Sequence, residues 1–327
     1  MRKFIKVLPL LLVASLTACN NLTEKKGVGF YFNAELSYSI YAKSNNVVKK
    51  IKDICQEIDN ISDPYEKRSI TNVYDINQTN DKIEISEKLF NLLEKAKKAQ
   101  ETAQYFNPLI GSLSNKWKEC LANHEILSND IIQEELEKIN NSSLVLDETN
   151  GCCAQRIGEA QIDLGGIAKG FALDRIYETL KQNNVSDYLI NCGSSSVLLG
   201  ENGHTQAWNS PRVTTYTVSL RDVPGTKFKA QNCVISSSGN DIQGVEISGT
   251  TYSHIINPTN GSAIMENDAV IVITSAGDGY LGDALSTSMM MNTVEEIKEI
   301  EKEVGAKTIV VKNKQIVYSH PDIKFVY

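Results

Sequence analysis

The chain has 327 residues, with 33 basic and 40 acidic side chains and a formal net charge of −7. This acidic balance, together with the lack of any basic block interleaved with aromatic residues, argues against nucleic acid as a partner. A chain of this length buries a large core, either as one large domain or as two lobes.

The first residues have the pattern of an export signal. Arg2, Lys3 and Lys6 form a basic head, and an apolar stretch follows from Val7 to Leu16. An apolar stretch of about ten residues spans roughly 15 Å as a helix, which is half of what a bilayer requires. We therefore interpret residues 1–18 as a signal peptide and not as a membrane-spanning helix.

The signal ends in the segment Leu16–Cys19, LTAC, which resembles a bacterial lipobox. Acylation would make Cys19 the first mature residue, and several acyl chains on one residue would anchor the protein stably. We expect a lipidated tether at residues 19–27 and a globular domain at residues 28–327. The protein is then exported and held at the periplasmic or extracellular face of a bacterial membrane. The alternative is an ordinary signal peptide with a cysteine nearby.

Six segments repeat apolar residues at three- and four-residue steps, which predicts helices. They are residues 46–59, 86–102, 130–139, 281–291 and 295–304, and a segment that begins just after Gly166.

Short runs rich in β-branched residues predict strands. They are residues 187–191, 196–199, 214–221, 233–237, 245–256, 269–274 and 307–318, with hairpin turns at Ser248-Gly249 and Asn313-Lys314. Because strands and helices do not alternate regularly, the pattern favours an α+β fold with mixed or antiparallel sheets and flanking helices.

Six cysteines follow Cys19, too few for a disulfide scaffold and without a C-x-x-C pair. The sequence leaves their redox state open.

The segment Asp163–Gly170, DLGGIAKG, has the chemistry of a phosphate-binding turn. The apolar run 160–164 predicts a strand that ends in Gly165-Gly166 before a helix. Glycines allow the backbone to approach a ligand, amides at a helix N-terminus point toward an anion, and Lys169 adds a positive charge. The alternative is a tight turn with close helix packing.

Asp283 and Thr287 lie four residues apart in a predicted helix, so their oxygens share one face. A hard cation such as Mg²⁺ binds oxygen ligands of this kind, and it takes only a few from the protein. The alternative is an aspartate that favours the helix dipole and an incidental threonine.

His254 stands at the end of a predicted strand, just before a proline–glycine turn. Histidine acts as a base near neutral pH, and loops at strand ends often display catalytic side chains. The alternative is a hydrogen-bonded structural histidine.

Earlier in the chain, aromatic residues in Tyr105–Gly111 and at Trp117 could stack on a flat ring or cap a hydrophobic core.

Together these segments resemble the ApbE family of FAD:protein FMN transferases, over nearly the whole exported domain. The matching segments, in order, are Asp59–Ser69, Phe106–Gly111, Asp163–Asp174, His254–Gly261 and Asp283–Thr287. The resemblance implies a T-fold-related, FAD-binding catalytic domain. Members transfer FMN from FAD to a threonine or serine hydroxyl of a partner flavoprotein, here one that is exported or at the membrane, and release AMP.

The resemblance also implies roles for particular residues. Mg²⁺ would be bound by Asp283, Thr287 and the backbone carbonyl of Gly166. The residues expected to contact FAD are Phe106, Asn107, Asp163, Gly165, Gly166, Lys169, His254 and Ile256. His254 and Asp283 are the candidate catalytic bases, and we favour His254 because a carboxylate bound to a cation is a weakened base.

The chain departs from the family pattern at several positions. Ala34–Leu36 stands in place of Met-Gly-Thr, Gly193–Ser195 in place of Gly-Gly-Asn, and Asn107 and Asn257 in place of aspartates. These changes leave two other hypotheses open. One is an FAD pyrophosphatase that releases FMN and AMP, and the other is a non-catalytic flavin-binding lipoprotein.

Overall fold

The structure is a computed structural model that describes residues 22–204, 214–240 and 244–326. The predicted signal peptide and Cys19 lie outside the described residues. Strand β1 begins at Thr23, so the part of the expected tether from residue 23 to residue 27 is paired in a sheet. The folded domain therefore starts about five residues earlier than the sequence suggested.

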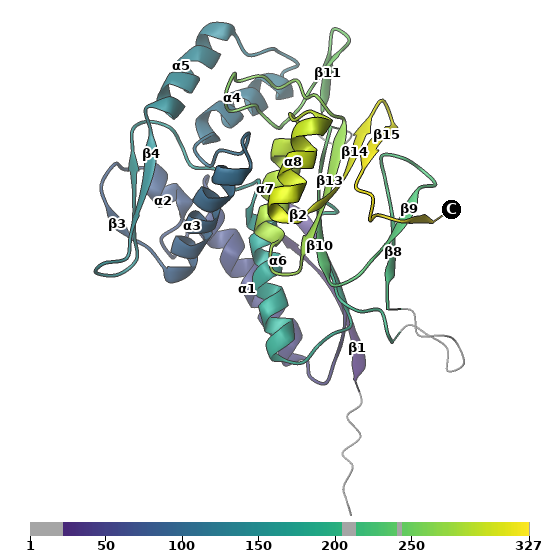
Figure 1. Cartoon of the computed structure of the whole chain (residues 1–327). Coiled ribbons are helices and arrows are strands. Elements are labelled where there is room, and N and C mark those ends of the chain that lie inside the picture. Colours follow the sequence, from purple (N-terminus) through teal and green to yellow (C-terminus); the bar gives the residue numbers. More distant parts are fainter. Residues whose placement is uncertain (1–21, 205–213, 241–243, 327) are drawn as a thin grey trace, which may run out of the picture.

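One eight-stranded antiparallel sheet forms the centre of the molecule (Figure 1). Its strands, in spatial order, are β1 (Thr23–Tyr31), β2 (Ala34–Ala42), β6 (Tyr188–Cys192), β7 (Ser196–Leu199), β10 (Cys233–Gly239), β13 (Ala269–Ser275), β14 (Lys307–Lys312) and β15 (Gln315–Ser319). Alternate residues of β2 and β6 are buried, as expected for strands with one face against helices.

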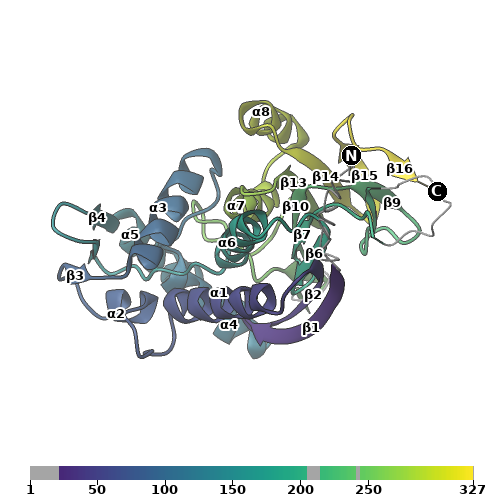
Figure 2. The same cartoon turned by 90° about the horizontal axis from the view of Figure 1, so that it is seen from below.

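Three helices pack side by side on one face of this sheet, as the view from below shows (Figure 2). They are α1 (Asn46–Ser62), α6 (Ala168–Gln182) and α7 (Gly279–Met289). Helix α7 is buried along most of its length, because it lies between the sheet, α6 and a further group of helices. Helix α8 (Val294–Val304) follows it and ends at Gly305, whose positive φ suits the end of a helix.

The further helices form a separate side of the molecule and share the main apolar core with α7. They are α2 (Val73–Asn77), α3 (Glu87–Thr102), α4 (Gly111–Ala122) and α5 (Asn129–Asn140). A small sheet of β3 (Ile83–Glu84), β5 (Cys153–Ile157) and β4 (Ser143–Asp147) completes this side.

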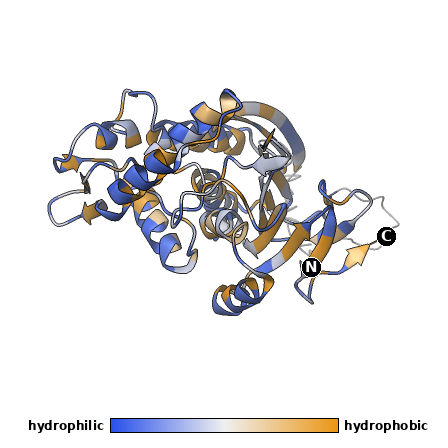
Figure 3. Ribbon diagram, turned by 90° about the horizontal axis from the view of Figure 1, so that it is seen from above, coloured by the Kyte–Doolittle hydropathy of each residue, from blue (hydrophilic) through white to orange (hydrophobic). Residues whose placement is uncertain are grey.

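The other face of the large sheet carries a second apolar cluster. Part of that cluster comes from a three-stranded sheet of β8 (Tyr216–Ser219), β9 (Lys227–Ala230) and β16 (Phe325–Val326). A short hairpin, β11 (Val245–Ile247) and β12 (Thr250–Tyr252), forms a separate two-stranded sheet that packs against the main apolar core. Figure 3 shows hydrophobic residues concentrated in the large sheet, with outer helices that are mostly hydrophilic on their exposed sides.

The predicted α+β class and all six predicted helices are confirmed. Turns occur at Ser248-Gly249 and at Asn313-Lys314, as predicted. The β1–β2 hairpin and α4 were missed, because glycines interrupt β1, and lysines and serines dilute the apolar spacing of α4. None of the described helices combines the length and the apolar character needed to cross a bilayer.

One further prediction was wrong. Residues 160–164 do not pair as a strand. They run as an extended segment held by single contacts, including one between the Ile162 amide and the Asn77 side chain at 2.8 Å. Side-chain and loop partners thus replace a sheet ladder, which the apolar composition of the segment does not reveal.

Candidate functional site

The buried carboxylate of Asp283, on α7, is the centre of the candidate site. One of its oxygens, Oδ2, accepts a hydrogen bond from the backbone amide of Gly170 at 2.6 Å. The other, Oδ1, accepts from the hydroxyl groups of Ser196 at 2.8 Å and Ser236 at 2.7 Å. Four elements, α6, α7, β7 and β10, therefore hold this carboxylate in one orientation.

Burial raises the pKa of Asp283, because a carboxylate removed from water loses the solvation of its charge. The positive charge of Lys169 and the three hydrogen bonds act in the opposite direction but do not cancel the effect. A divalent cation beside the carboxylate would offset the same cost. The environment of Asp283 thus fits a site that binds a cation.

Gly166 brings the glycine turn against α7. A Cβ atom placed on Gly166 would lie 3.5 Å from Oγ1 of Thr287 and 3.3 Å from Cε2 of Phe106. The turn, the hydroxyl of Thr287 and the ring of Phe106 therefore meet at one point. Phe106 and Thr287 lie far from Gly166 in the sequence, and the packing of both α3 and α6 against α7 brings the three residues together.

The carboxylate of Asp283, the hydroxyl of Thr287 and the carbonyl of Gly166 are oxygen ligands of the kind that Mg²⁺ binds. The described residues contain no group of three or more His, Cys, Asp or Glu side chains that could hold a metal ion. A cation at this site would therefore depend on one carboxylate, a hydroxyl and a backbone carbonyl, with the remaining ligands from phosphate and water. Mg²⁺ commonly binds proteins in this way.

The loop that carries Phe106 and Asn107 lies beside the glycine turn. The amide of Asp163 donates to the carbonyl of Pro108 at 2.8 Å, and the side chain of Asp163 accepts from the amide of Gly165 at 2.7 Å. Asn107 accepts from the amide of Leu109 at 2.9 Å, so its side chain stabilises its own turn. The structure therefore places Phe106, Asn107, Asp163 and Gly165 in adjoining loops.

Helices α6 and α7 approach each other through two glycines. A Cβ atom on Gly170 would lie 2.8 Å from the amide nitrogen of Tyr280 and closer still to the carbonyl of Gly279. Asp174, one turn further along α6, accepts from the amides of Gly279 at 2.6 Å and Tyr280 at 2.9 Å. These contacts show that position 170 requires a glycine because the two helices pack closely there. Close packing was the alternative to phosphate binding that the sequence had left open.

Two backbone amides of the turn donate hydrogen bonds to carboxylates within the described residues, Gly165 to Asp163 and Gly170 to Asp283, and both carboxylates belong to the chain itself. Lys169, the residue before Gly170, is half-buried and lies within electrostatic range of Asp283. The turn therefore places a lysine and a carboxylate next to each other.

His254 is partly buried, and its Nδ1 atom has no hydrogen-bond partner within the described residues. Burial, together with the positive charges of Lys118 and Lys169, lowers the pKa of His254 to about 4. The imidazole is therefore neutral at physiological pH and able to accept a proton. Its nearness to Lys169 connects it to the Asp283 site.

Ile256, two residues later, is only 5% exposed and belongs to the main apolar core. Its contact with FAD remains a prediction. Trp117 of α4 supports the same segment, because its indole donates to the carbonyl of Gly261 at 2.9 Å and its ring stacks on Tyr252. Trp117 therefore packs in the hydrophobic core, which is the second of the two roles that the sequence suggested for it, and not the stacking on a flat ring.

Lys118 is a site residue that the sequence did not reveal. Its amine donates to the hydroxyl of Tyr65 at 2.7 Å and lies within electrostatic range of Asp163 and His254. Partial desolvation lowers the pKa of Lys118, but the hydrogen bond to Tyr65 and the negative charge of Asp163 raise it by more. The pKa of Lys118 is therefore above its ordinary value. The aromatic neighbour Trp117 was visible in the sequence, but the direction of the Lys118 side chain was not.

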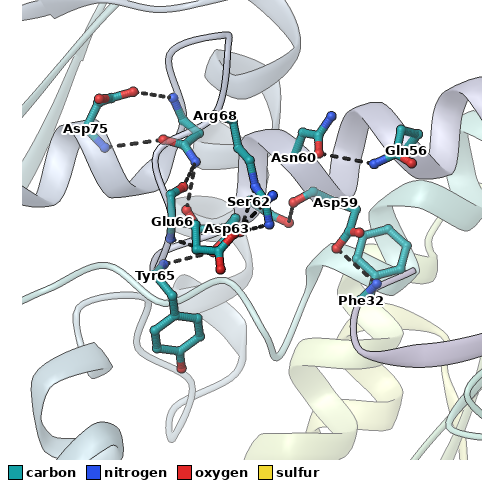
Figure 4. Close-up of polar contacts among 11 residues, drawn as sticks. Phe32, Gln56, Asp59, Asn60, Ser62, Asp63, Tyr65, Glu66, Arg68 and Asp75 are labelled. Atoms are coloured by element: carbon teal, nitrogen blue, oxygen red, sulfur yellow. Dashed lines mark hydrogen bonds and ion pairs between the residues drawn. The ribbon is translucent and has the colours of Figure 1, made fainter. Parts of the chain in front are cut away.

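Tyr65 belongs to a loop that follows α1 and is held by its own polar contacts (Figure 4). Asp63 accepts from the amide of Tyr65 at 2.8 Å and pairs with the guanidinium of Arg68. Asp59, one helical turn earlier, accepts from the amide of Phe32 in the β1–β2 turn at 2.9 Å. The segment Asp59–Ser69 thus joins the hairpin to the site.

Two of the departures from the family pattern, Ala34–Leu36 and Gly193–Ser195, lie side by side. The amide of Gly193 donates to the carbonyl of Glu35 at 2.8 Å, and a Cβ atom on Gly193 would lie 2.7 Å from Cβ of Ala34. The turn Gly193–Ser195 leads directly into Ser196, which binds Asp283. These substitutions therefore border one edge of the site.

The sequence predicted Asp283, Thr287, Gly166 and Lys169, and the structure brings them together. The sequence did not reveal the hydroxyl groups of Ser196 and Ser236 around Asp283. The only available signal was the polar run Ser236–Ser238 within an otherwise apolar strand.

The match to a family model covers residues 31–310, and the family is described as the ApbE family. The chain belongs to the ApbE family. Among curated relatives, an FAD:protein FMN transferase of Klebsiella pneumoniae is 28% identical over 78% of this chain and 79% of its own length. Another, from Haemophilus influenzae, is 24% identical over 92% of this chain and 90% of its own length.

Solved structures support the same fold. The ApbE protein of Thermotoga maritima matches with a TM-score of 0.77 and 19% identity, over 91% of this chain and 97% of that one. The flavin transferase ApbE of Vibrio cholerae matches with a TM-score of 0.70 and 17% identity, over 92% of this chain and 98% of that one. The α+β architecture with a central antiparallel sheet is therefore that of ApbE flavin transferases.

Proposed function

We propose that this protein is an Mg²⁺-dependent FAD:protein FMN transferase that attaches FMN to a threonine or serine hydroxyl of an exported or membrane flavoprotein. One observation supports this most strongly. A buried carboxylate, Asp283, meets the glycine turn Gly166–Gly170 beside the hydroxyl of Thr287. This arrangement suits a metal-bound diphosphate, and relatives across nearly the whole chain are FAD:protein FMN transferases.

The reaction breaks the phosphoanhydride bond of FAD and forms a phosphoester bond to the acceptor. The acceptor hydroxyl attacks the phosphorus on the riboflavin side of FAD, the bond to the bridging diphosphate oxygen breaks, and AMP leaves. Such transfers depend on positioning and charge neutralisation more than on covalent help from the enzyme. Mg²⁺ bound by Asp283, Thr287 and the Gly166 carbonyl would neutralise phosphate charge, and Lys169 would add to this effect.

His254 is the group that we assign to the proton of the acceptor hydroxyl. It is neutral at physiological pH, whereas Asp283 already accepts three hydrogen bonds and would also bind the cation. A base with a pKa of about 4 is weak in the free protein. The negative charge of bound FAD would raise the pKa of His254 toward neutrality, where a general base is most effective.

An acceptor-labelling assay tests this function. The purified protein is incubated with FAD and Mg²⁺, with and without an exported flavoprotein acceptor, and the denatured acceptor is examined for flavin fluorescence. We expect a fluorescent acceptor band that requires Mg²⁺ and is abolished by a chelator. Asp283→Ala should abolish it as well. The matched control is Asp278→Ala, because Asp278 is exposed, begins the same helix and makes no side-chain cap bond.

The same assay separates the two other hypotheses. Release of AMP at the same rate without an acceptor, and no labelled acceptor, would identify an FAD pyrophosphatase. Tight FAD binding without AMP at any Mg²⁺ concentration would identify a flavin-binding protein. The altered segments Ala34–Leu36 and Gly193–Ser195 are the features that favour the second of these alternatives.

We also propose that the mature protein is anchored by acylated Cys19 at the periplasmic or extracellular face of a bacterial membrane. The support is the basic head, the short apolar stretch and the LTAC segment. Intact mass measurement of the membrane fraction tests this, with acyl chains on residue 19 as the expected result. Replacement Cys19→Ser should leave the protein unacylated.

A further inference from the structure

Four lysines gather around one shallow depression of the surface, outside the candidate active site. Lys25 and Lys26 come from β1, and Lys49 and Lys52 come from the first turns of α1. We call these four residues the lysine face. The single acidic residue in the same depression is Glu24.

The charge of the lysine face is largely uncompensated. Lys26 pairs with Glu24 at 3.0 Å, but Lys25, Lys49 and Lys52 form no ion pair within the described residues. Residues 22–53 contain six lysines against three acidic residues, although the whole chain has a net charge of −7. The positive charge is therefore concentrated at one end of an acidic protein.

The position of Lys49 is also unfavourable for the helix that carries it. Helix α1 begins at Asn46 and has no acidic residue in its first turn. The N-terminal end of a helix is its positive pole, so Lys49, at the end of the first turn, is repelled by it. Local stability would favour acidic residues there, and departures of this kind commonly mark a functional surface.

The lysine face lies beside the start of the folded domain. Strand β1 begins at Thr23, four positions after Cys19. A chain extends by at most about 3.5 Å per residue, so four residues reach roughly 14 Å. With the proposed anchor at Cys19, the lysine face would be within reach of the lipid headgroups.

We propose that the lysine face docks on the anionic phospholipid headgroups of the membrane and orients the protein on it. This inference rests on the proposed anchoring at Cys19. Juxtamembrane lysines are attracted to anionic lipid surfaces over about one Debye length. An acyl anchor with a connection of roughly 14 Å keeps the lysine face near the surface, so that the four lysines can approach the headgroups to within that distance.

Docking in this orientation sets the height of the active site above the membrane. Strand β1 runs from the lysine face to the turn at Phe32, which binds Asp59, and it rises about 25 Å at roughly 3.3 Å per residue. Helix α6 runs from Lys169 back toward the same end of the molecule (Figure 1), over a length of about 20 Å. The acceptor hydroxyl would therefore be modified about 20 to 25 Å above the headgroups.

Lysine footprinting on the native, membrane-anchored protein tests the orientation. The purified protein is reconstituted in vesicles of phosphatidylcholine alone or of phosphatidylcholine mixed with phosphatidylglycerol, and each lysine's acetylation rate is measured by mass spectrometry. We expect acetylation of Lys25, Lys26, Lys49 and Lys52 to slow by about threefold or more on the anionic vesicles, and to recover at high salt. Equal rates on both vesicles would overturn the proposal.

Two exposed lysines on other elements are the internal reference. Lys302 lies on α8 and Lys314 in the β14–β15 turn, and both elements are drawn far from the start of β1 (Figure 1). Their rates should be the same on both kinds of vesicle. Protection of these lysines to the same degree would indicate a different orientation and would contradict the proposal.

A pair of double variants provides the second test. Lys49→Glu with Lys52→Glu should abolish the protection of Lys25 and Lys26, whereas Lys302→Glu with Lys314→Glu should leave it intact. Both variants should transfer FMN to a soluble acceptor at the native rate. Retained protection in the first variant would refute the proposal.

The outcomes separate this inference from the two proposals that precede it. Protection without FMN transfer would contradict the proposed function and leave the docking surface supported. If the protein has no acyl chain, sedimentation with anionic vesicles replaces the reconstitution. Binding that requires phosphatidylglycerol, is lost at high salt and is lost in the Lys49–Lys52 variant would support the lysine face, and the absence of such binding would overturn it.

Discussion

The carboxylate of Asp283 accepts a hydrogen bond from the backbone amide of Gly170 at 2.6 Å, although the two residues are 113 positions apart. This bond joins the first turn of α6 to the middle of α7. Because Lys169 precedes Gly170, the same contact sets the distance between a positive side chain and a buried negative one. The relationship explains why the glycine turn and the Asp283–Thr287 pair act as a single site.

Two glycines of this turn should respond differently to substitution by alanine. Gly170→Ala places a methyl group against the backbone of Gly279 and Tyr280, so we expect the free energy of unfolding to fall by about 3 kcal/mol. Gly166→Ala places a methyl group 3.3 Å from Phe106 and 3.5 Å from Thr287, where small shifts accommodate it. We expect Gly166→Ala to change the unfolding free energy by less than about 1 kcal/mol but to reduce FMN transfer at least tenfold.

Urea denaturation and the acceptor-labelling assay measure the two effects. Equal loss of stability in both variants would show that Gly166 is needed for packing and not for the site. A fully active Gly166→Ala variant would contradict the placement of the metal and diphosphate against this glycine.

Replacement of His254 by alanine should reduce the rate of FMN transfer by about 100- to 10,000-fold, because the acceptor hydroxyl loses its base. FAD binding should remain within about threefold of the native affinity, since the imidazole is neutral and carries no charge for the phosphates. Stopped assays of transfer and fluorescence titration with FAD measure the two quantities. If both fall together, His254 contributes to binding and the assignment as a base is wrong.

Thr287→Val removes one proposed metal ligand while it keeps the shape of the side chain. We expect the Mg²⁺ concentration for half-maximal transfer to rise about tenfold or more, because Mg²⁺ would lose an oxygen ligand. Thr287→Ser is the matched control, since it retains the hydroxyl and should stay near the native requirement. A titration of activity against Mg²⁺ measures the change, and identical curves for the valine and serine variants would exclude Thr287 as a ligand.

Asp174 should make the stability of the protein depend on pH. Burial raises the pKa of Asp174 to about 7, and the amides of Tyr280 and Gly279 only partly offset this effect. Between the ordinary pKa of 3.8 and this raised pKa, the folded state binds more protons than the unfolded state. The free energy of unfolding should therefore decrease as pH rises from about 4 to about 7, by at most about 1.4 kcal/mol per pH unit from this group.

Asp174→Asn should remove this contribution, and urea denaturation at several pH values measures the difference between the variant and the native protein. Glu178→Gln is the control, because Glu178 lies one turn away on α6 and is exposed. A difference that does not vary with pH, or one of the opposite sign, would show that Asp174 is not protonated preferentially in the folded state.

Ser194 occupies a backbone conformation that suits glycine. Its φ is +58°, in the left-handed region, and it stands in the β6–β7 turn where the family pattern has a second glycine. Ser194→Gly should therefore increase the free energy of unfolding by about 1 kcal/mol, since the strain of a side chain at positive φ is removed. Ser195→Gly, which is not at positive φ, should instead be neutral or destabilising, and thermal denaturation of both variants distinguishes the two outcomes.

The sequence alone was sufficient for features that depend on neighbouring residues. Amphipathic spacing predicted α1, α3 and α6 within a few residues, because each of these helices presents one continuous apolar face to the core. The Asp163–Gly170 and Asp283–Thr287 segments were recognisable for the same reason, since each is a short run with distinctive residue types.

Tertiary structure alone decided which distant groups share a site. Ser196 and Ser236 bind Asp283 because β7 and β10 are adjacent in the sheet and place both hydroxyl groups beneath α7. Lys118 approaches His254 and Asp163 only through the packing of α4. Strand register and helix packing set these contacts, and both depend on the whole core, whereas a residue pattern records only what its own segment prefers.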